Sequence, residues 1–315
     1  MSVLSNDPAE VALRIHGEGS SVGARAKRAF TALTRTRRGQ IGFVLLALFL
    51  IMALFGPFLA PQDPNAASSF STSGAQNLAS PSSAHLLGTD EQGRDVLSAL
   101  MFGARISLFV GGASVLLSLA IGVSLGLVSG YVGGRLDALI MRICDVMLSF
   151  PSILIALLFA GVGHALFPNA NDSLAFGVVI VAIALPGWVQ YARAVRGSTM
   201  VERHKEYVQA ARVIGVPPLR IMLRHVLPNV MGPVLVLSTI QVAVAILAEA
   251  TLSFLGVGVS PTSPSLGTFI NEGNKQLFSG AWWLVIFPGA TLVLIALSIN
   301  LFGDWLRDAL NPRLR

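Results

Sequence analysis

The sequence contains few charged residues, a single cysteine and only three lysines. Asp, Glu, Lys and Arg together make up 12% of its 315 residues, about half of the share found in typical soluble proteins. Hydrophobic residues make up 53%, and the mean hydropathy is +0.70. This leaves too little polar surface to cover a water-soluble globule of this size, and too much apolar surface for a disordered chain. The composition predicts a membrane protein.

The scarcity of cysteine and lysine excludes several kinds of site. Cys144 on its own can form neither an internal disulfide nor a structural zinc site. None of the lysines follows a glycine, so the sequence has no Gly-Lys-Ser/Thr phosphate loop, and it has no HExxH metalloprotease motif either. If this protein uses ATP, a separate chain must hydrolyse it.

Six apolar runs are long enough to cross a bilayer as helices, which takes about 20 residues each. None of them alternates polar and apolar residues as a barrel strand would. The sequence therefore predicts an all-α protein with six transmembrane helices. The runs comprise residues 41–60, 107–130, 146–163, 174–195, 230–255 and 283–302.

The positive charges predict that both termini are cytoplasmic. If the N-terminus lies inside, all but three of the 22 Lys and Arg residues fall on the inner side, and the three exceptions are Arg94, Arg105 and Lys275. Positive residues concentrate in the cytoplasmic segments of membrane proteins. The net charge of +6 is therefore interpreted as an orientation signal and not as a nucleic-acid-binding surface.

The segment between the first two spans, residues 61–103, is expected to lie on the outer side of the membrane. Its second part has the residue pattern of a short amphipathic helix. Asp90 can cap a short amphipathic helix that runs into Val96, Leu97, Leu100 and Met101 and suits the outer membrane interface. Asp90, Glu91 and Asp95 lack the spacing and the carbonyl-rich loop of a calcium site. They are expected to be solvated turn residues.

Small residues recur at every fourth position of the second span. A spacing of four places them in a ridge on one helix face, and such a ridge lets another backbone approach closely within a membrane. The ridge predicts either packing within the chain or the lining of a pathway, and neither exposes it to lipid. Its members are Ser114, Ser118, Gly122, Gly126 and Gly130.

The connection between the fourth and fifth spans is too long for a turn and too regular for a linker. Residues 202–214 are rich in strong helix formers, and Gly215 can end that helix in a left-handed conformation. Pro217 and Pro218 suit the first turn of a second helix, over 219–227, which would end at the next proline. The expected product is a hairpin with arginines around a small apolar tip, suited to docking a cytoplasmic partner. DNA binding is disfavoured, because the hairpin is pinned at the bilayer.

Polar residues within the spans are candidates for the translocation path. Ser238, Gln241 and Glu249 lie in the fifth span, where a carboxylate usually faces a cavity or a partner, although near the interface Glu249 could also reach lipid headgroups. Arg142 and Asp145 lie three residues apart near the start of the third span and are expected to pair with one another.

The hairpin sequence resembles the EAA loop of ABC importer permeases. In that family the pattern is Glu-Ala-Ala, three residues, Gly, nine residues, Ile, one residue and Leu-Pro. This sequence keeps all the spacings but has Gln209 in place of the family's Glu and His225 in place of its Ile, so any salt bridge made by that Glu is lost. The residues that match are Ala210, Ala211, Gly215, Leu227 and Pro228.

Further motifs look like those of the second permease in the dipeptide/oligopeptide/nickel subfamily, with the dipeptide and glutathione branches most similar. The likeness runs from about residue 40 to the C-terminus. The motifs are Gly88-Thr-Asp-Glu-Gln-Gly-Arg-Asp-Val96, Met141-Arg-Ile-Cys-Asp145, Ser149-Phe-Pro151, Arg224-His-Val-Leu-Pro-Asn229, Leu252-Ser-Phe-Leu-Gly256 and Gly303-Asp-Trp-Leu-Arg-Asp-Ala-Leu-Asn-Pro312.

The resemblance implies a type I ABC importer transmembrane fold in the bacterial inner membrane. In that family the hairpin is a coupling helix seated in a groove of an ATP-binding subunit, whose closure on ATP shifts the spans between inward- and outward-open states. The implied partners are a homologous second permease, two ATP-binding subunits that carry ATP and Mg, an extracytoplasmic solute-binding protein and membrane lipid. No cofactor is expected in this chain, and no nucleic acid partner.

Contact with the ATPase is therefore assigned to the hairpin, with Gly215 and Pro228 setting its geometry. For Arg212 and Arg220 individually, the alternative is that they are solvated residues that only orient the chain. The residues assigned to coupling are Gln209, Ala210, Ala211, Arg212, Gly215, Val216, Pro217, Pro218, Leu219, Arg220, Leu227 and Pro228.

The expected function is that of a permease subunit which imports dipeptides or oligopeptides without an ATPase site of its own, and glutathione or nickel are alternative solutes. A self-sufficient channel or secondary carrier is the competing hypothesis, but neither a filter element nor inverted repeats can be recognised. An intramembrane enzyme is disfavoured because the spans hold no paired nucleophile and base. The expected organisation is a basic tail (1–40), a first span with its outer loop (41–103), a five-helix core (104–303) containing the hairpin (196–228), and a C-terminal tail (304–315).

Overall fold

The computed structural model describes residues 37–60, 77–168, 171–259 and 263–310. Most of the expected basic tail, part of the outer loop and residues 311–315 lie outside the described residues. Within the described ranges the regular elements are helices, apart from one isolated bridge between Thr89 and Asp95. The elements are α3 (Arg37–Leu59), α4 (Val96–Val132), α5 (Gly134–Leu148), α6 (Ser152–Leu166), α7 (Asp172–Glu202), α8 (Glu206–Val213), α9 (Pro218–Ile221), the π-helix η2 (Met222–Val226), α10 (Leu227–Phe254), α11 (Leu266–Gln276), the 3-10 helix η3 (Leu277–Ser279) and α12 (Trp283–Leu310).

Five helical stretches in the described part of the chain are long and apolar enough to cross a membrane: α3, α4, α7, the continuous run from α9 to α10, and α12. The third predicted span differs, because α5 and α6 meet at 90° and form at most one broken span. Pro151 explains the break, since proline has no N–H and disfavours helical geometry in the residue before it. The prediction of an unbroken helix over 146–163 is therefore wrong.

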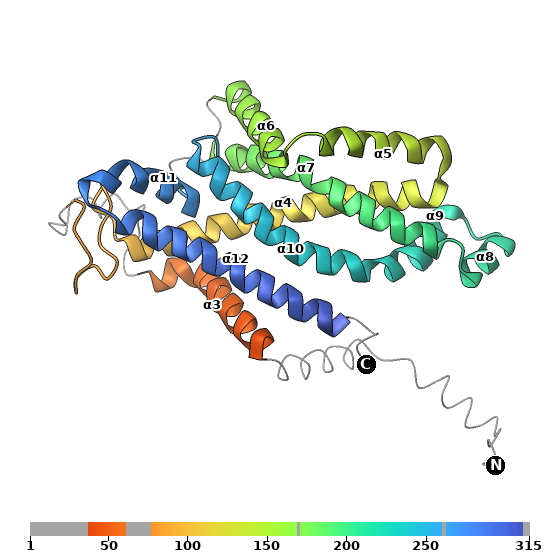
Figure 1. Cartoon of the computed structure of the whole chain (residues 1–315), viewed down its shortest axis with the longest axis horizontal. Helices are drawn as coiled ribbons and strands as arrows, with labels where there is room; N and C mark the ends of the chain where they lie inside the picture. The colour runs from red at the N-terminus through yellow and green to blue at the C-terminus, as the bar shows by residue number, and fades with distance from the viewer. Residues whose placement is uncertain (1–36, 61–76, 169–170, 260–262, 311–315) are drawn as a thin grey trace, which may run out of the picture.

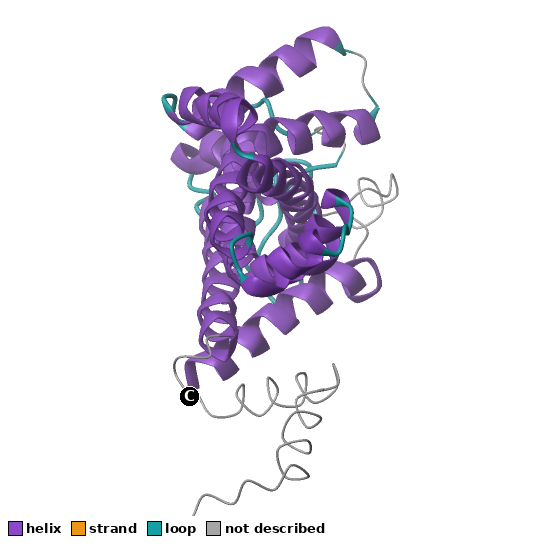
Figure 2. Ribbon diagram, turned by 90° about the vertical axis from the view of Figure 1, so that its right-hand side faces the viewer, coloured by secondary structure: helices purple, strands orange, loops and turns teal. Residues whose placement is uncertain are grey.

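The long helices run along a common axis (Figure 1). α4 packs along α7, α10 contacts α4, α7 and α12, and α3 covers the outer side of α12. One end of the bundle, here called the hairpin end, carries α8 and α9, while the other, the loop end, carries α11 and residues 77–95 (Figure 1). Figure 2 looks along the bundle from the hairpin end.

The ridge of small residues on α4 is the surface on which α7 packs. A Cβ atom at Gly122 would lie 2.4 Å from the carbonyl oxygen of Trp188, and one at Gly126 would lie 2.5 Å from that of Ala192. Ser118 in the same ridge donates a 3.2 Å hydrogen bond from its hydroxyl to a carbonyl of α7. Close packing within the chain, one of the two expected alternatives, is confirmed.

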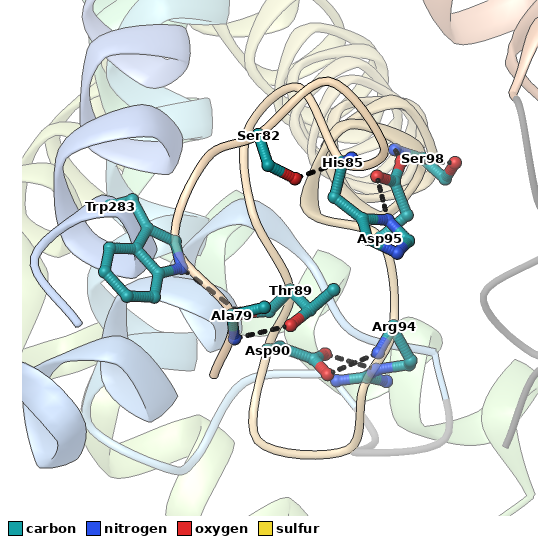
Figure 3. A network of polar contacts seen from close by, with 9 residues as sticks. All are labelled: Ala79, Ser82, His85, Thr89, Asp90, Arg94, Asp95, Ser98 and Trp283. Carbon is teal, nitrogen blue, oxygen red and sulfur yellow. Dashed lines mark hydrogen bonds and ion pairs between the residues drawn. The ribbon is translucent and has the colours of Figure 1, made fainter. Parts of the chain in front are cut away.

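Residues 78–95 form a hydrogen-bonded loop against α4 and α12 (Figure 3). Asp95 caps α4: its Oδ2 accepts the backbone N–H of Ser98 at 2.9 Å, and its Oδ1 lies 3.2 Å from Nδ1 of His85. α4 starts directly after Asp95 and continues unbroken. The expected cap at Asp90 and the expected separate interfacial helix are therefore wrong, because the helix that starts here is the second span itself.

Asp90 instead forms a buried ion pair with Arg94 (Figure 3). The Nε atom of Arg94 lies 2.5 Å from Oδ2 of Asp90, and Nη2 of Arg94 lies 3.4 Å from Oε2 of Glu272 on α11. Asp90 and Asp95 are each only 4% exposed. The expectation of solvated turn residues is wrong for these two, whereas Glu91 is exposed as expected.

Two elements close the loop end. Trp283, at the start of α12, donates a 3.1 Å hydrogen bond from Nε1 to the carbonyl oxygen of Thr89 (Figure 3). α11, which was not predicted, begins with a capping box formed by Ser265 and Thr268. Together they fasten the loop to the last span.

Candidate functional site

The turn of the hairpin has the geometry that its glycine and prolines predict. Gly215 has φ +78°, its N–H donates to the carbonyl of Arg212 at 3.0 Å, and the N–H of Val216 donates to that of Ala211 at 3.0 Å. These two bonds form a Schellman motif, which requires a left-handed residue at the glycine position. α9 then begins at Pro218, one residue before the expected start at Leu219.

Two predicted boundaries of the hairpin are wrong. The first helix begins at Glu206 and not at residue 202, because residues 203–205 form the turn that ends α7. The second helix does not end at Pro228, because a π-turn precedes it and the N–H of Leu227 donates to the carbonyl of Met222, five residues back. The wider turn accommodates Pro228, which has no N–H to donate. The helix therefore continues without interruption from the hairpin into α10.

The tip of the hairpin is an exposed apolar surface. Val213 is 86% exposed, Ile214 78% and Leu219 64%. Val216, assigned to coupling, is instead half-buried and packs on the core of the bundle. Val213 and Ile214 were missed because the family pattern marks Gly215 and not the helical turn before it, where their exposure follows from the phase of α8. We call Val213, Ile214 and Leu219 the hairpin tip.

The other residues assigned to coupling divide between exposed and packed positions. Ala211 is buried and Leu227 is half-buried. The exposed residues are Gln209, Ala210, Arg212, Gly215, Pro217, Pro218, Arg220 and Pro228.

Arginines connect the hairpin to the end of α4. The guanidinium of Arg212 lies over the ring of Tyr131, 4.9 Å from its centroid, and its Nε lies 3.3 Å from the Tyr131 hydroxyl. Arg203 donates from Nη1 to the carbonyl oxygens of Gly130 at 2.9 Å and Tyr131 at 3.3 Å. Arg212 is therefore held against α4, and it is more than a solvated positive charge.

Tyr207 connects the hairpin to the start of α10. Its hydroxyl donates to the carboxylate of Glu202 and accepts a 3.0 Å hydrogen bond from the amide of Asn229. Burial and the bond to Glu202 raise the pKa of Tyr207 to about 12. The phenol is thus protonated at physiological pH and remains a donor. Gln209, which replaces the family's Glu, makes a 3.4 Å contact from Nε2 to the carbonyl of Arg203.

Acidic residues of α5 bind arginines of α7. Arg196 forms a bidentate pair with Asp137 at 2.5 and 2.7 Å, and Asp145 pairs with Arg193. The expected pair of Arg142 with Asp145 is wrong, because α5 packs beside α7 and brings Arg193 to the carboxylate. Local spacing on one helix could not reveal that neighbour.

A cavity of about 420 Å³ lies among α4, the α5–α6 break, α7 and α10. Of the three translocation-path candidates, Gln241 lies in its wall. Ser238 instead donates its hydroxyl to the carbonyl of Val234 at 2.8 Å.

Glu249 is fully buried. Its two carboxylate oxygens accept hydrogen bonds from the hydroxyls of Ser107 and Ser253, each at 2.7 Å. The carboxylate therefore faces neither the cavity nor lipid headgroups and joins α10 to α4 in this structure.

The chain is similar to known membrane components of transport systems. Residues 122–315 match the family model described as "Binding-protein-dependent transport system inner membrane component", and residues 25–81 match the "N-terminal TM domain of oligopeptide transport permease C".

Curated relatives align over most of their length. The dipeptide transport system permease protein DppC of Bacillus subtilis is 40% identical over 288 residues, which cover 91% of this chain and 85% of that protein. The di/tripeptide transport system permease protein DppC of Pseudomonas aeruginosa is 41% identical over 280 residues, covering 88% of this chain and 89% of that protein.

The fold resembles that of a solved structure of the methionine ABC transporter MetNI in an inward-facing conformation. The TM-score is 0.55 at 18% identity, and the match covers 69% of this chain and 98% of that chain. At this identity the likeness concerns the fold alone.

Proposed function

The chain belongs to the family of binding-protein-dependent transport system inner membrane components, and on this premise we propose that it forms one half of a peptide-conducting pathway. It is the permease subunit of an ABC importer and is not itself an enzyme. ATP is hydrolysed on separate subunits, and a binding protein delivers the solute. We further propose the class of solute, a homologous second permease as partner, and an orientation of the chain in the membrane.

The proposed solute is a dipeptide or short oligopeptide. The support is that relatives about 40% identical over some nine-tenths of the chain carry dipeptide or di/tripeptide in their names. Glutathione and nickel are the alternative solutes. In the proposed assembly, a homologous second permease completes the pathway, and two ATP-binding subunits drive it.

The proposed orientation places the hairpin end and both termini in the cytoplasm of a bacterial cell, with the chain in the inner membrane. The distribution of positive charge supports it, because inner-membrane proteins concentrate Lys and Arg on the cytoplasmic side. Arg203, Arg212 and Arg220 lie on or beside the hairpin, whereas Arg94 and Lys275 lie at the loop end.

The observation that carries the proposal is the exposed hairpin tip on a well-defined turn. Exposed apolar surface at the end of a helical hairpin is typical of a docking site. ATP-driven closure of the docked subunits would displace the hairpin. The contacts of Arg212 with Tyr131 and of Tyr207 with Asn229 would pass that displacement to α4 and α10.

Replacing Ile214 with aspartate is expected to reduce the amount of ATP-binding subunit that copurifies with the tagged permease by roughly 10-fold or more. The reason is that a charge would be placed in an apolar contact near the centre of the interface. The matched control is Phe278→Asp at the loop end, where the side chain is 99% exposed, and we expect it to leave copurification unchanged.

Two results would contradict the proposal. One is copurification that is equal in the two variants and in the wild type. The other is uptake of a labelled dipeptide into liposomes that contain this chain alone, without ATP, which would favour a secondary carrier or channel.

A further inference from the structure

The cavity beside the α5–α6 break lies at the middle of the spans. Gln241 is near the midpoint of α10, and Gly187, also in the cavity wall, is at the midpoint of α7. Its volume of about 420 Å³ falls within the range of roughly 300–1,000 Å³ that small-molecule sites occupy. A solute that crosses between the spans must pass this depth.

Interrupted backbone lines the cavity. Its wall includes Phe150 and Ser152, on either side of the proline where α5 and α6 meet at 90°, and Pro186, which lies inside α7. At membrane depth, non-helical backbone is tolerated where it is buried in protein or lines a water-filled space. Transporters commonly place their solute sites at such discontinuous helices.

The chemistry of the lining is uncharged. None of the lining residues is Asp, Glu, Lys, Arg or His. The hydroxyl of Ser118 donates to the carbonyl of Ala184 at 3.2 Å, and that of Thr251 donates to the carbonyl of Leu247 at 2.7 Å, so both are already engaged. The remaining polar side chains of the wall are Ser152, Gln190, Tyr191 and Gln241, and the buried Tyr191 hydroxyl has no hydrogen-bond partner among the described residues.

Gln190 and Gln241 are the side-chain amides of this wall. Gln190 is exposed and Gln241 half-buried, and among the described residues neither amide is engaged in a hydrogen bond. A glutamine amide presents both a carbonyl acceptor and N–H donors. It can therefore bond to the N–H and the C=O of a peptide unit, which would otherwise lose its hydrogen bonds to water in an apolar cavity.

A metal ion does not suit this lining. First-row transition metals bind imidazole, thiolate or carboxylate ligands, and the cavity wall contains none of these groups. Apolar surface with two amides also places few demands on a solute's side chains, which suits peptides of varied sequence.

We propose that this cavity is the subunit's share of the solute site and that Gln190 and Gln241 bind the backbone amide groups of the peptide in transit. This rests on the proposed function, because it presumes that a peptide passes between the spans. The two glutamines then select a solute that contains amide groups and not a metal ion. The side chains of the peptide face the apolar part of the cavity wall.

The test uses the complete transporter with its binding protein in liposomes, with a labelled dipeptide and its ester analogue, in which oxygen replaces the amide N–H, as probes. Gln190→Leu and Gln241→Leu keep the side-chain size and remove the amide. Each is expected to lower dipeptide uptake by roughly 5- to 100-fold, as expected when a buried peptide group loses its partner. Thr291→Val on α12 is the matched control, because the Thr291 hydroxyl is bonded within its own helix and the residue lies outside the cavity wall, and it should retain wild-type uptake.

The ratio of amide to ester uptake separates a solute contact from a packing defect. We expect the wild type and Thr291→Val to prefer the amide, and at least one of the leucine variants to lose that preference, since the same binding protein serves every variant. An unchanged ratio in both leucine variants, or an equal loss of uptake in Thr291→Val, would overturn the assignment. If the wild-type complex itself imports no dipeptide, the proposed function has failed and not merely the assignment of these residues.

Discussion

Replacing Gly126 with leucine is expected to separate α4 from α7 and to prevent the subunit from folding into a stable bundle. A Cβ atom at this position would lie 2.5 Å from the carbonyl oxygen of Ala192 and 3.0 Å from the Cβ of Val195. Both are fixed parts of α7, so the helices must move apart. Overpacking of this kind costs about 1–3 kcal/mol in well-packed cores, and leucine adds four heavy atoms where one does not fit.

Two measurements are made on the detergent-solubilised protein: its thermal unfolding transition and its elution profile in size-exclusion chromatography. Gly112 provides a matched control on the same helix, because a Cβ atom there meets nothing within 4 Å. We expect Gly112→Leu to keep the monodisperse peak and the wild-type transition, and Gly126→Leu to aggregate or to unfold many degrees lower. Equal behaviour of the two variants would show that the ridge is not the packing surface.

Replacing Gly215 with valine is expected to weaken docking of the ATP-binding subunit by roughly 5- to 150-fold. The physical reason is backbone strain: Gly215 has φ +78°, and a residue other than glycine pays about 1–3 kcal/mol in such a conformation, with β-branched residues worst placed. The Schellman turn would open, and the hairpin tip would no longer be presented in one geometry. Insertion into the membrane should be unaffected.

Gly256 is the matched control for this strain. It has φ +82°, and a Cβ atom added there would meet nothing within 4 Å, as at Gly215, but it lies near the loop end. Gly256→Val therefore carries the same local penalty away from the hairpin and should leave ATPase docking intact. Gly215→Asn should retain most of the docking, since asparagine tolerates the left-handed region. Docking is measured by copurification, and wild-type recovery with Gly215→Val would contradict the role of the turn.

The sequence predicts most of the scaffold, because membrane spans and tight turns depend on local properties. Hydropathy and length locate the spans, the four-residue spacing of Gly122 and Gly126 indicates a packing face, and Gly215 with Pro217 defines the turn of the hairpin. Each feature is dictated by residues that are close together in the chain. Pro151 indicates that the third span is broken. The apolar run continues across this proline, however, and hydropathy alone cannot reveal a bend.

What the sequence does not predict depends on neighbours from other helices. Asp145 has Arg142 three residues away, yet it binds Arg193, because α5 packs beside α7. The apolar run around Glu249 implies a polar partner, but it cannot distinguish a cavity from two serine hydroxyls. Ile214, at the end of α8, is exposed, while Val216, beyond the turn at Gly215, packs on the core of the bundle. Which of these two apolar residues is covered depends on how the hairpin lies against the other helices.

The central claim is that a separate ATP-driven subunit binds the hairpin tip. Its most direct test is site-specific photo-crosslinking in membranes. Cys144 is buried and can be replaced by alanine, so that a benzophenone maleimide labels Ile214→Cys at the tip or Phe278→Cys at the loop end. The account predicts that an adduct with an ATP-binding subunit forms from Ile214→Cys and not from Phe278→Cys. Adducts with lipid alone from Ile214→Cys, or an ATP-binding subunit captured from Phe278→Cys, would contradict it.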